Sequence, residues 1–409
     1  HLWIDNSPAS AYQGNLYDAW TRFDSGHSND NEIEISRSTN NGVSWSTPVN
    51  ISSGVSAGSH NQGVNIQTGP LGQVYVCWSI YDSWPSDETA IGFCRSTNGG
   101  SSYTTASRII TNIRGIRDSE TSKNQRVNSF PSMTVDLSGG TYNGHIYIVW
   151  TNIGTPGVNT GTNRSIYMSK STNGGTSWST PVRVNQGPTG NGYEAYFPWI
   201  TCDPTTGNLY CIFYDDRNTT STSCEVFVAM STNGGSSWTD MRVSDVSFTP
   251  SPIPGMASGY MGDYLGIAAL DNIIYPTWTD NRSGHALSYC SPLNLGGYCS
   301  ASGGCDEYIA IVQIGSINNS SACDGYHDYT ALSASVPING QELLTVTNGV
   351  TTWPSDQCGV WIDWNDDGDF YDSGEALTVS GTPGVGPYTA MVDPPTGLSV
   401  GDSRTMRIR

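Results

Sequence analysis

Basic residues are scarce in this chain. Only 17 of its 409 residues are Lys or Arg, against 36 Asp and Glu, which gives a formal net charge of −19. Two of the 17 are lysines, Lys123 and Lys170. A surface this acidic repels polyanions, so nucleic acid is not expected as a partner. No apolar run approaches the roughly 18 residues that a membrane-spanning helix requires, so direct insertion into a membrane is not expected either.

Closely spaced cysteines are also missing. The ten cysteines include no Cys-x-x-Cys pair and no cluster of Cys with His, which argues against a zinc or redox centre. Disulfides formed in an oxidising compartment are the favoured interpretation, and free core cysteines are the alternative. Cys77 and Cys94 fall on strands that we expect to be adjacent, so they are candidates for pairing. The chain begins at His1 with no recognisable signal peptide, and we expect a processed or truncated product of a longer secreted precursor.

Helical periodicity is absent as well, and one short pattern occurs four times instead. Each copy begins with Ser-Thr-Asn, contains Gly and ends in an aromatic residue; the copies are Ser38–Trp45, Ser96–Tyr103, Ser171–Trp178 and Ser231–Trp238. They start 58, 75 and 60 residues apart, the period of an array of β-sheets. The Asn amide is expected to hydrogen-bond the backbone two residues on, and Gly permits a positive φ. Each copy, called a box turn below, should therefore close a hairpin.

The pattern resembles the Asp-box (BNR) repeat of sialidases and their relatives, with Asn at the usual Asp position. In sialidase-like propellers the box lies away from the active site, which implies a structural role. Apolar residues around each box alternate with a period of two, as in four-stranded antiparallel blades. Four blades carry a box, and a fifth, which starts at Leu265, does not. The resemblance implies six blades; we expect the sixth to precede His1 in the precursor, and a different ring closure is the alternative.

Tryptophans recur at equivalent strand ends in these blades. They are Trp20, Trp78, Trp150 and Trp278. A residue repeated at one place in four of the five blades is expected to pack between blades rather than to stack on a ligand.

The composition changes after Leu295. Residues 299–409 hold 14 acidic residues and three arginines, a net charge of −11. The stretches Gly325–Thr330 and Val360–Asn365 resemble the GEVED domain, a β-sandwich module appended to secreted bacterial proteins. We therefore expect an all-β chain with a propeller at 1–295 and a GEVED-like sandwich at 296–409. The resemblance implies a secreted or cell-surface bacterial protein.

One acidic stretch in the second region has the pattern of a calcium loop. Between Asp363 and Glu375, oxygen-bearing side chains at positions 1, 3 and 5 precede Gly368 at position 6. The flanking residues indicate strands, so this is not an EF-hand. Carboxylates so close together repel one another unless a cation binds them. The predicted ligands of a structural Ca²⁺ are Asp363, Asn365, Asp367, Asp369, Asp372 and Glu375. A solvated acidic hairpin is the alternative.

Propeller geometry predicts where a ligand binds. Loops that join second to third strands share one face with loops that enter each first strand, and the box turns lie on the opposite face. Arg, carboxylate and Tyr side chains gather in the first two sets of loops, which suits glycan recognition by hydrogen bonds and aromatic platforms. The residues predicted to bind a ligand on this face are Arg22, Asp24, Asp82, Arg126, Asp216 and Asp280.

Sialidase chemistry is a second interpretation of this face. It requires three arginines that clamp a carboxylate, an acid/base Asp and a Tyr nucleophile activated by Glu. The candidates are Arg217, Arg282, Glu194, Tyr196, Tyr264 and Asp263. The Arg-Ile-Pro signature of the family is not present in the sequence. Because an Asp/Asn-Arg pair follows the second strand in two blades, a repeated structural ion pair linking neighbouring blades is the favoured alternative for Arg217 and Arg282.

The sequence therefore predicts a secreted propeller with a non-catalytic binding or structural role towards a glycan or another extracellular polymer. A sialidase-type glycoside hydrolase is the first alternative. The second is a subunit of an extracellular filament or surface layer that self-associates through edge strands at 1–5 or 404–409.

Overall fold

The computed structural model describes most of the chain as strands and turns, without a helix. The described residues are 1–23, 31–188, 192–219, 222–295, 307–323, 325–349, 353–365, 368, 370, 372 and 374–409. None of them belongs to a helix long and apolar enough to cross a membrane. The chain divides into two compact units, His1–Leu293 and Asn294–Arg409.

The first unit is built from short strands. They are β1 (Leu2–Ile4), β2 (Leu16–Arg22), β3 (Glu32–Ser38), β4 (Val49–Asn50), β5 (His60–Thr68), β6 (Val74–Tyr81), β7 (Ala90–Ser96), β8 (Ser107–Thr111), β9 (Ser132–Val135), β10 (Ile146–Ile153), β11 (Arg164–Ser171), β12 (Val182–Arg183), β13 (Ala195–Cys202), β14 (Leu209–Asp215), β15 (Glu225–Ser231), β16 (Thr239–Arg242), β17 (Gly266–Leu270), β18 (Ile273–Asp280) and β19 (Leu287–Cys290), with β20 (Leu293–Asn294) at its end.

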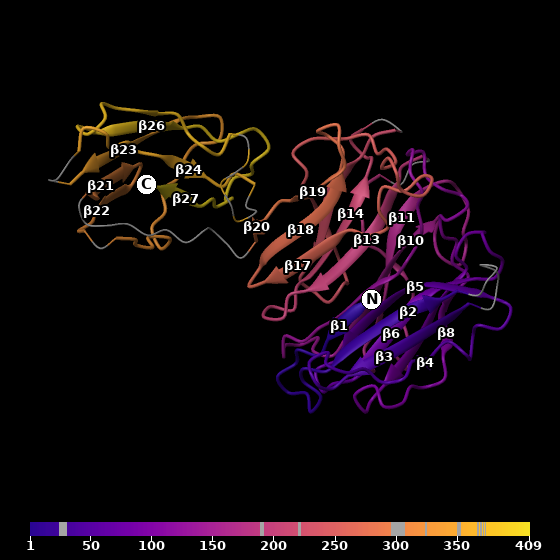
Figure 1. Ribbon diagram of the computed structural model, residues 1–409. Helices are drawn as coiled ribbons and strands as arrows, with labels where there is room; N and C mark the ends of the chain where they lie inside the picture. Colours follow the sequence, from indigo (N-terminus) through magenta and orange to yellow (C-terminus); the bar gives the residue numbers. More distant parts are fainter. Residues whose placement is uncertain are drawn as a thin grey trace. The chain divides into compact units, whose positions relative to one another are not determined.

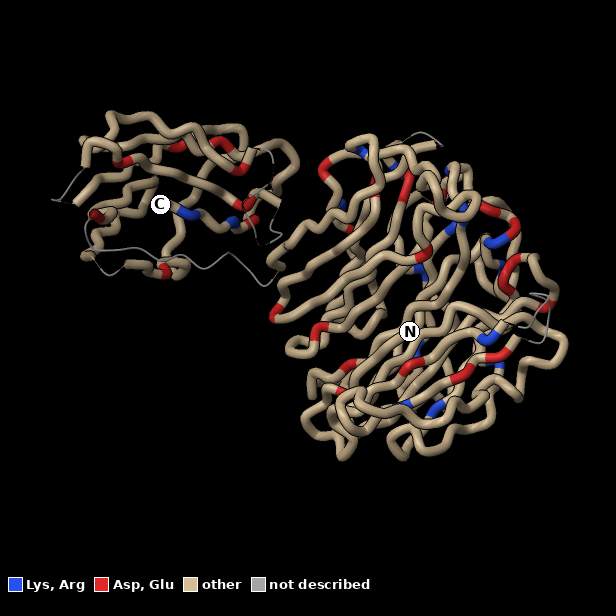
Figure 2. Tube along the Cα trace, viewed as in Figure 1, with Lys and Arg blue, Asp and Glu red and all other residues tan. Residues whose placement is uncertain are grey.

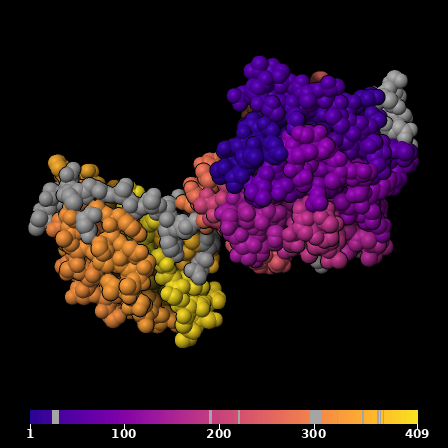
Figure 3. Space-filling view, turned by 90° about the horizontal axis from the view of Figure 1, so that it is seen from below, coloured from indigo at the N-terminus to yellow at the C-terminus, as the bar shows by residue number. Residues whose placement is uncertain are grey.

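These strands form five antiparallel sheets in chain order. The first four are meanders of four strands each, and the fifth contains β17, β18 and β19, with β20 also paired to β18. The inner strands contact one another from sheet to sheet, β5 with β9, β9 with β13 and β13 with β17. This is the arrangement of blades in a propeller (Figure 1). On the surface, consecutive stretches of the sequence form contiguous patches of this unit (Figure 3). The predicted all-β propeller with five visible blades is confirmed.

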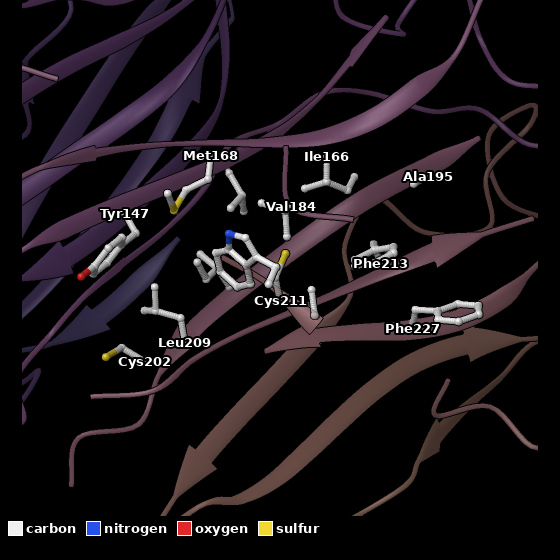
Figure 4. Packing of buried hydrophobic residues seen from close by; sticks show 14 residues of the cluster. Tyr147, Ile166, Met168, Val184, Ala195, Cys202, Leu209, Cys211, Phe213 and Phe227 are labelled. Atoms are coloured by element: carbon white, nitrogen blue, oxygen red, sulfur yellow. The ribbon is translucent and has the colours of Figure 1, made fainter. Parts of the chain in front are cut away.

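The hydrophobic core of this unit lies between consecutive sheets. On β6, Val76 and Trp78 pack against the first sheet, whereas Tyr75 and Cys77 pack with residues of the third. The next interface joins the third and fourth sheets, where Met168 and its neighbours meet Leu209, Cys211 and Phe213 (Figure 4). Successive side chains of a strand point to opposite faces, so a strand covered on both sides has a continuous apolar sequence. Each large apolar side chain buried in this way contributes roughly 1.5–3 kcal/mol.

The repeated aromatic residues distinguish covered from uncovered sheets. Trp78 and Trp150 are fully buried between sheets, which confirms their predicted packing role. Tyr17, three residues before Trp20 in β2, is also fully buried, but Tyr275, three residues before Trp278 in β18, is 47% exposed. The outer face of the fifth sheet is therefore not covered by another sheet of the described chain. The sixth blade stays a prediction.

The proposed pairing of Cys77 with Cys94 is wrong. Cys94 lies opposite Val76 in the β6–β7 register, whereas Cys77 lies opposite Phe93. The two thiols consequently point to opposite faces of the sheet, and both cysteines are free. Cys202, Cys211, Cys224, Cys290 and Cys358 are free as well. Cys323, in the second unit, is disulfide-bonded; Cys299 and Cys305 lie outside the described residues.

The four box turns have the same internal hydrogen bonds. The Ser Oγ accepts a bond from the backbone N–H of a Gly four residues on, at 2.8–3.0 Å. The Asn Oδ1 accepts one from the backbone N–H four residues on, at 2.9–3.0 Å, rather than two residues on as predicted. The Gly that donates this N–H has a φ of +75 to +85° in every copy, a conformation in which a side chain would be strained.

Basic residues connect each box turn to the next. Arg37 donates to the carbonyl oxygen of Gly99 at 2.7 Å, Arg95 donates to that of Gly174, and Lys170 donates to that of Gly234 at 2.7 Å. Each cation stands immediately before the Ser of one box and reaches the fourth position of the next. Met230 occupies this place before the fourth box, and the fifth sheet has no box for it to reach. We call these contacts latches.

The second unit is a smaller β-structure. Its strands are β21 (Ile309–Ile314), β22 (Ile317–Ser320), β23 (Glu342–Asn348), β24 (Val360–Ile362), β25 (Val379–Ser380), β26 (Tyr388–Val392) and β27 (Met406–Ile408). A five-stranded sheet has the order β22-β21-β23-β26-β25, and β24 pairs with β27. Side chains of both sheets, including Leu344, Ile362 and Tyr388, share one core, as in a sandwich.

Candidate functional site

A long connection organises one face of the propeller unit. Residues 112–131 join β8 to β9, and we call this segment the strap. Connections of this length are uncommon in compact domains and are usually functional. The strap reaches loops of later sheets: Lys123 contacts Glu194 and Asp216, and the backbone N–H of Arg126 donates to the carbonyl oxygen of Gly259 at 2.7 Å.

Glu88 anchors the two ends of the strap. Its carboxylate accepts bonds from the backbone N–H groups of Ile116 and Arg117 at one end, and of Ser129 at the other. The Tyr81 hydroxyl donates to it at 2.8 Å. Glu88 is fully buried, and this burial raises its pKa against the opposing effect of the hydrogen bonds.

A buried ion cluster anchors the middle of the strap. The Lys123 ammonium lies 2.8 Å from Glu194 Oε2 and 2.8 Å from Asp216 Oδ2. Ser122 donates to Glu194 through its backbone N–H and its hydroxyl, and Arg164 lies 3.5 Å from the same carboxylate. Burial raises the pKa of Asp216, and the bond from Lys123 opposes this. Because these charges compensate one another, the cluster fixes the strap rather than offering charge to a ligand.

Two arginines of the strap have no carboxylate partner. In the described part of the chain, Arg117 and Arg126 form no ion pair, although acidic residues outnumber basic ones two to one (Figure 2). The Arg117 guanidinium lies 5.3 Å from the centre of the Trp84 ring, and that of Arg126 lies 4.5 Å from the Tyr260 ring. The Nε of Arg117 is buried without a hydrogen-bond acceptor.

Asp263 lies near both arginines. Asn128 donates a hydrogen bond to its Oδ1 at 3.0 Å. Burial raises the pKa of Asp263, while the positive charges of Arg126 and Arg117 act in the opposite direction. The carboxyl group is thus held close to two cations without a direct ion pair to either.

Aromatic side chains extend from this carboxyl group. Tyr264 follows Asp263 and is 53% exposed. Its ring lies 6.0 Å from that of Phe130 and packs edge-on against Trp199 at 5.8 Å. Trp199 in turn lies 6.1 Å from the ring of His1. We call Arg117, Arg126, Asn128, Asp263 and Tyr264 the strap site.

The structure places Arg217 and Arg282 in ion pairs with carboxylates of the fourth and fifth sheets. Arg217 lies 2.7 Å from Asp215 and 2.6 Å from Asp240. Arg282 lies 2.6 Å from Asp280 and also pairs with Asp245. Both guanidinium groups stack on an aromatic ring of the adjacent third strand, Phe227 and Tyr289 respectively. The motif is structural: the ion pairs of Arg217 lie within the fourth sheet, whereas Arg282, just after β18, also reaches Asp245 just after β16, so it links neighbouring blades as predicted.

The other predicted residues divide between structural contacts and the strap site. Tyr196 is buried and accepts a hydrogen bond from Gln125 at 2.9 Å, so it is not paired with Glu194. Arg22 pairs with Glu32 and Glu34, and Asp82 with Arg108. Arg126, Asp263 and Tyr264 come together at the strap site. Asp24 lies outside the described residues.

Sequence reasoning missed Arg117, Lys123, Asn128 and Tyr260. The length of the strap was the available signal. It also contains one of only two lysines in the chain, in a segment otherwise rich in small polar residues.

The predicted calcium loop is described only in part. Gly368 donates its backbone N–H to Asp363 Oδ2 at 2.9 Å, and Asn365 donates to Asp372 Oδ2 at 2.5 Å. Glu375 is buried and accepts backbone bonds from Trp364 and Asp372. Asp367 and Asp369 lie outside the described residues. Within the described ones, no three His, Cys, Asp or Glu side chains are placed to hold a metal.

Comparison with known proteins identifies one part of the chain. Residues 357–409 match the GEVED domain. None of the curated protein sequences is significantly similar to this chain. Among solved structures, the α-L-arabinofuranosidase of Fusarium graminearum with arabinobiose is 13% identical, with 69% of this chain and 78% of that chain covered and a TM-score of 0.39. A Hadza microbial sialidase is 12% identical, with 85% and 66% covered and a TM-score of 0.40.

A third similar structure is a protein of unknown function from Dyadobacter fermentans. It is 11% identical, with 92% of this chain and 90% of that chain covered and a TM-score of 0.39. At these identities and scores, the matches assign no reaction, ligand or residue role to this chain.

Proposed function

We propose that the propeller unit binds a carbohydrate at the strap site without cleaving it, on the outside of the cell. Tyr264 is the observation that carries this proposal. Its ring is half exposed and supported by Phe130 and Trp199, beside amide and carboxyl groups of Asn128 and Asp263. Sugar rings stack on such supported aromatic faces, and their hydroxyls bond to adjacent polar groups.

Binding without hydrolysis is supported by the contacts of the other candidate catalytic groups, which are bonded within the protein. Glycoside hydrolysis generally needs two carboxyl groups, or a Tyr nucleophile activated by Glu. Glu194 is bonded to Ser122 and Lys123. Arg217 and Arg282 are paired within the structure. Asp263 is therefore the one predicted acid/base candidate that lies in the strap site.

A hydrolase remains the second candidate, and Asp263 is the observation that favours it. Burial raises the pKa of this carboxyl group, as a general acid requires. Incubation of the protein with a fluorogenic sialoside and with arabinan separates the two candidates. Binding without product supports the first, whereas product that Asp263→Asn abolishes supports the second.

The binding experiment uses Tyr264 and a matched control. The full chain is sedimented with a panel of insoluble polysaccharides, and the bound fraction is measured for wild type, Tyr264→Ala and Tyr275→Ala. Tyr275 is 47% exposed but lies on the outer face of the fifth sheet. Loss of binding in Tyr264→Ala alone is expected. Equal binding by all three proteins contradicts the proposal.

We further propose that the loop at 363–375 binds a structural Ca²⁺. Asn365 donates to Asp372, and the backbone N–H of Asp372 donates to Glu375, within the loop that also contains Asp363. Oxygen ligands of this kind suit a hard cation. Bound calcium would offset the repulsion between carboxylates that burial strengthens. Secretion fits this proposal, because structural calcium sites are common in extracellular proteins.

A further inference from the structure

We infer that the carbohydrate bound at the strap site carries an anionic group, a carboxylate or a sulfate ester, which lies between Arg117 and Arg126. This inference rests on the proposed carbohydrate binding and names the chemical class of the ligand. Three independent observations support it.

The first observation is how the other cations of the propeller are used. Arg22, Arg108, Arg114, Arg164, Arg217, Arg242, Arg282 and Lys123 pair with carboxylates, and Arg37, Arg95, Arg183 and Lys170 donate to backbone carbonyls. Arg117 and Arg126 alone make neither contact within the described residues. In a chain with a net charge of −19, this leaves two cations near Asp263 that have neither partner.

The second observation is the desolvation of Arg117. Its Nε is buried without an acceptor, and a buried donor that lacks an acceptor destabilises the unliganded protein. Trp84 covers one face of the guanidinium group. A ligand oxygen would satisfy the remaining donors, and carboxylate and sulfate groups have oxygens spaced for such paired bonds.

The third observation is the rigidity of the strap. Glu88 fixes Arg117 through its backbone N–H, and the buried Lys123 ion cluster lies three residues before Arg126. The N–H of Arg126 is itself bonded to Gly259. Because the backbone is held at these points, binding loses little conformational freedom, which raises the affinity for a matching anion.

Asp263 sets the rest of the specificity. A carboxylate near the arginines repels a second anion at its own position but accepts hydrogen bonds from hydroxyl groups. The ligand that fits is therefore a sugar with both an anionic group and free hydroxyls, stacked on Tyr264. A simple anion lacks the hydroxyls, and a neutral sugar leaves the arginines without an acceptor.

The experiment compares polymers that differ only in charge. Polygalacturonate is compared with fully methyl-esterified pectin, and dextran sulfate with dextran, by affinity electrophoresis of the full chain at low and high salt. At least one acidic polymer should retard the wild-type protein, and its neutral partner should not. Binding of polygalacturonate indicates a carboxylate ligand, and binding of dextran sulfate indicates a sulfate ester.

Variants test the role of the two arginines. Arg117→Gln and Arg126→Gln should each weaken binding of the acidic polymer about tenfold or more, as expected when a charged hydrogen-bond donor is lost. Arg126→Lys retains the charge and should retain part of the affinity. Arg108→Gln, which removes one partner of a surface ion pair, should bind as wild type does. Melting curves confirm that the variants are folded.

The outcomes separate this inference from the proposed function. Equal binding of charged and neutral polymers, with no effect of the arginine variants but loss in Tyr264→Ala, overturns the anionic ligand and leaves carbohydrate binding intact. Absence of any binding that depends on Tyr264 overturns both. Binding of acidic polymers that Arg108→Gln weakens as much as Arg126→Gln indicates general charge attraction and also overturns the inference.

Discussion

Lys123 and Glu194, 71 residues apart in the chain, form a buried ion pair with a separation of 2.8 Å. The pair holds the strap over the face that carries Asp263 and Tyr264. It links the connection between the second and third sheets to the fourth sheet.

Replacement of Lys123 by Met should strongly destabilise the propeller unit. It leaves the buried carboxylates of Glu194 and Asp216 without their cation, and breaking a buried pair in this way costs about 3–5 kcal/mol. Urea unfolding measures the loss. Arg108→Gln breaks the exposed pair with Asp82 and should cost less than about 1 kcal/mol. Equal stability of the two variants would show that the cluster does not anchor the strap.

The latches between box turns predict that two opposite substitutions have unequal effects on stability. Arg95→Met removes the bond to the Gly174 carbonyl and should lower the free energy of unfolding by about 1 kcal/mol. Met230→Arg places a cation where no box follows, so stability should change by less than about 0.5 kcal/mol. Thermal unfolding of both variants tests this. A gain from Met230→Arg equal to the loss from Arg95→Met would contradict the latch.

Local repeats were predictable because their contacts are local. Ser96, Asn98 and Gly100 bond to one another within a few residues, so their spacing alone specifies the turn. The nearly continuous apolar run Val74–Tyr81 likewise is typical of a strand buried on both faces. The Asp215–Arg217 pair is two residues apart, and its repetition correctly indicated a structural role.

The strap site was only partly predictable, because its contacts are long-range. Lys123 and Asp216 are 93 residues apart, and no spacing in the sequence connects them. Arg126, Asp263 and Tyr264 were predicted from loop positions as separate candidates. Their proximity, and the participation of Arg117, depend on how the strap crosses the face. Cys77 and Cys94 do lie on adjacent strands, as predicted. The register, however, places their side chains on opposite faces of the sheet, so they do not pair.

Binding of an anionic polymer should strengthen as the pH falls from neutrality towards the pKa of Asp263. Burial raises the pKa of this group. Its protonation removes a negative charge beside Arg126, so anion binding and proton uptake favour each other. A sulfated ligand keeps its own charge over this pH range, so any pH dependence of its binding comes from the protein rather than from the ligand. Asp263→Asn should bind with little pH dependence; an unchanged pH profile in that variant would exclude Asp263 as the titrating group.

Removal of calcium should destabilise the second unit. A ligand present at about one hundred times its dissociation constant stabilises the folded state by about 2.7 kcal/mol. Addition of a chelator should therefore lower the melting temperature of wild type but not of Asp363→Asn, which weakens the site. Asp393→Asn changes an exposed carboxylate outside the loop and should still respond. If neither chelator nor added calcium changes the melting temperature of the wild-type protein, the calcium site is ruled out.

The most direct measurement is a crystal structure of the full chain with the acidic oligosaccharide that binds best. We predict a sugar ring against Tyr264, with its anionic group within hydrogen-bond distance of Arg117 and Arg126. A sugar bound beside Arg217 or Arg282, or bound at the strap with its anionic group directed away from both strap arginines, would contradict the account.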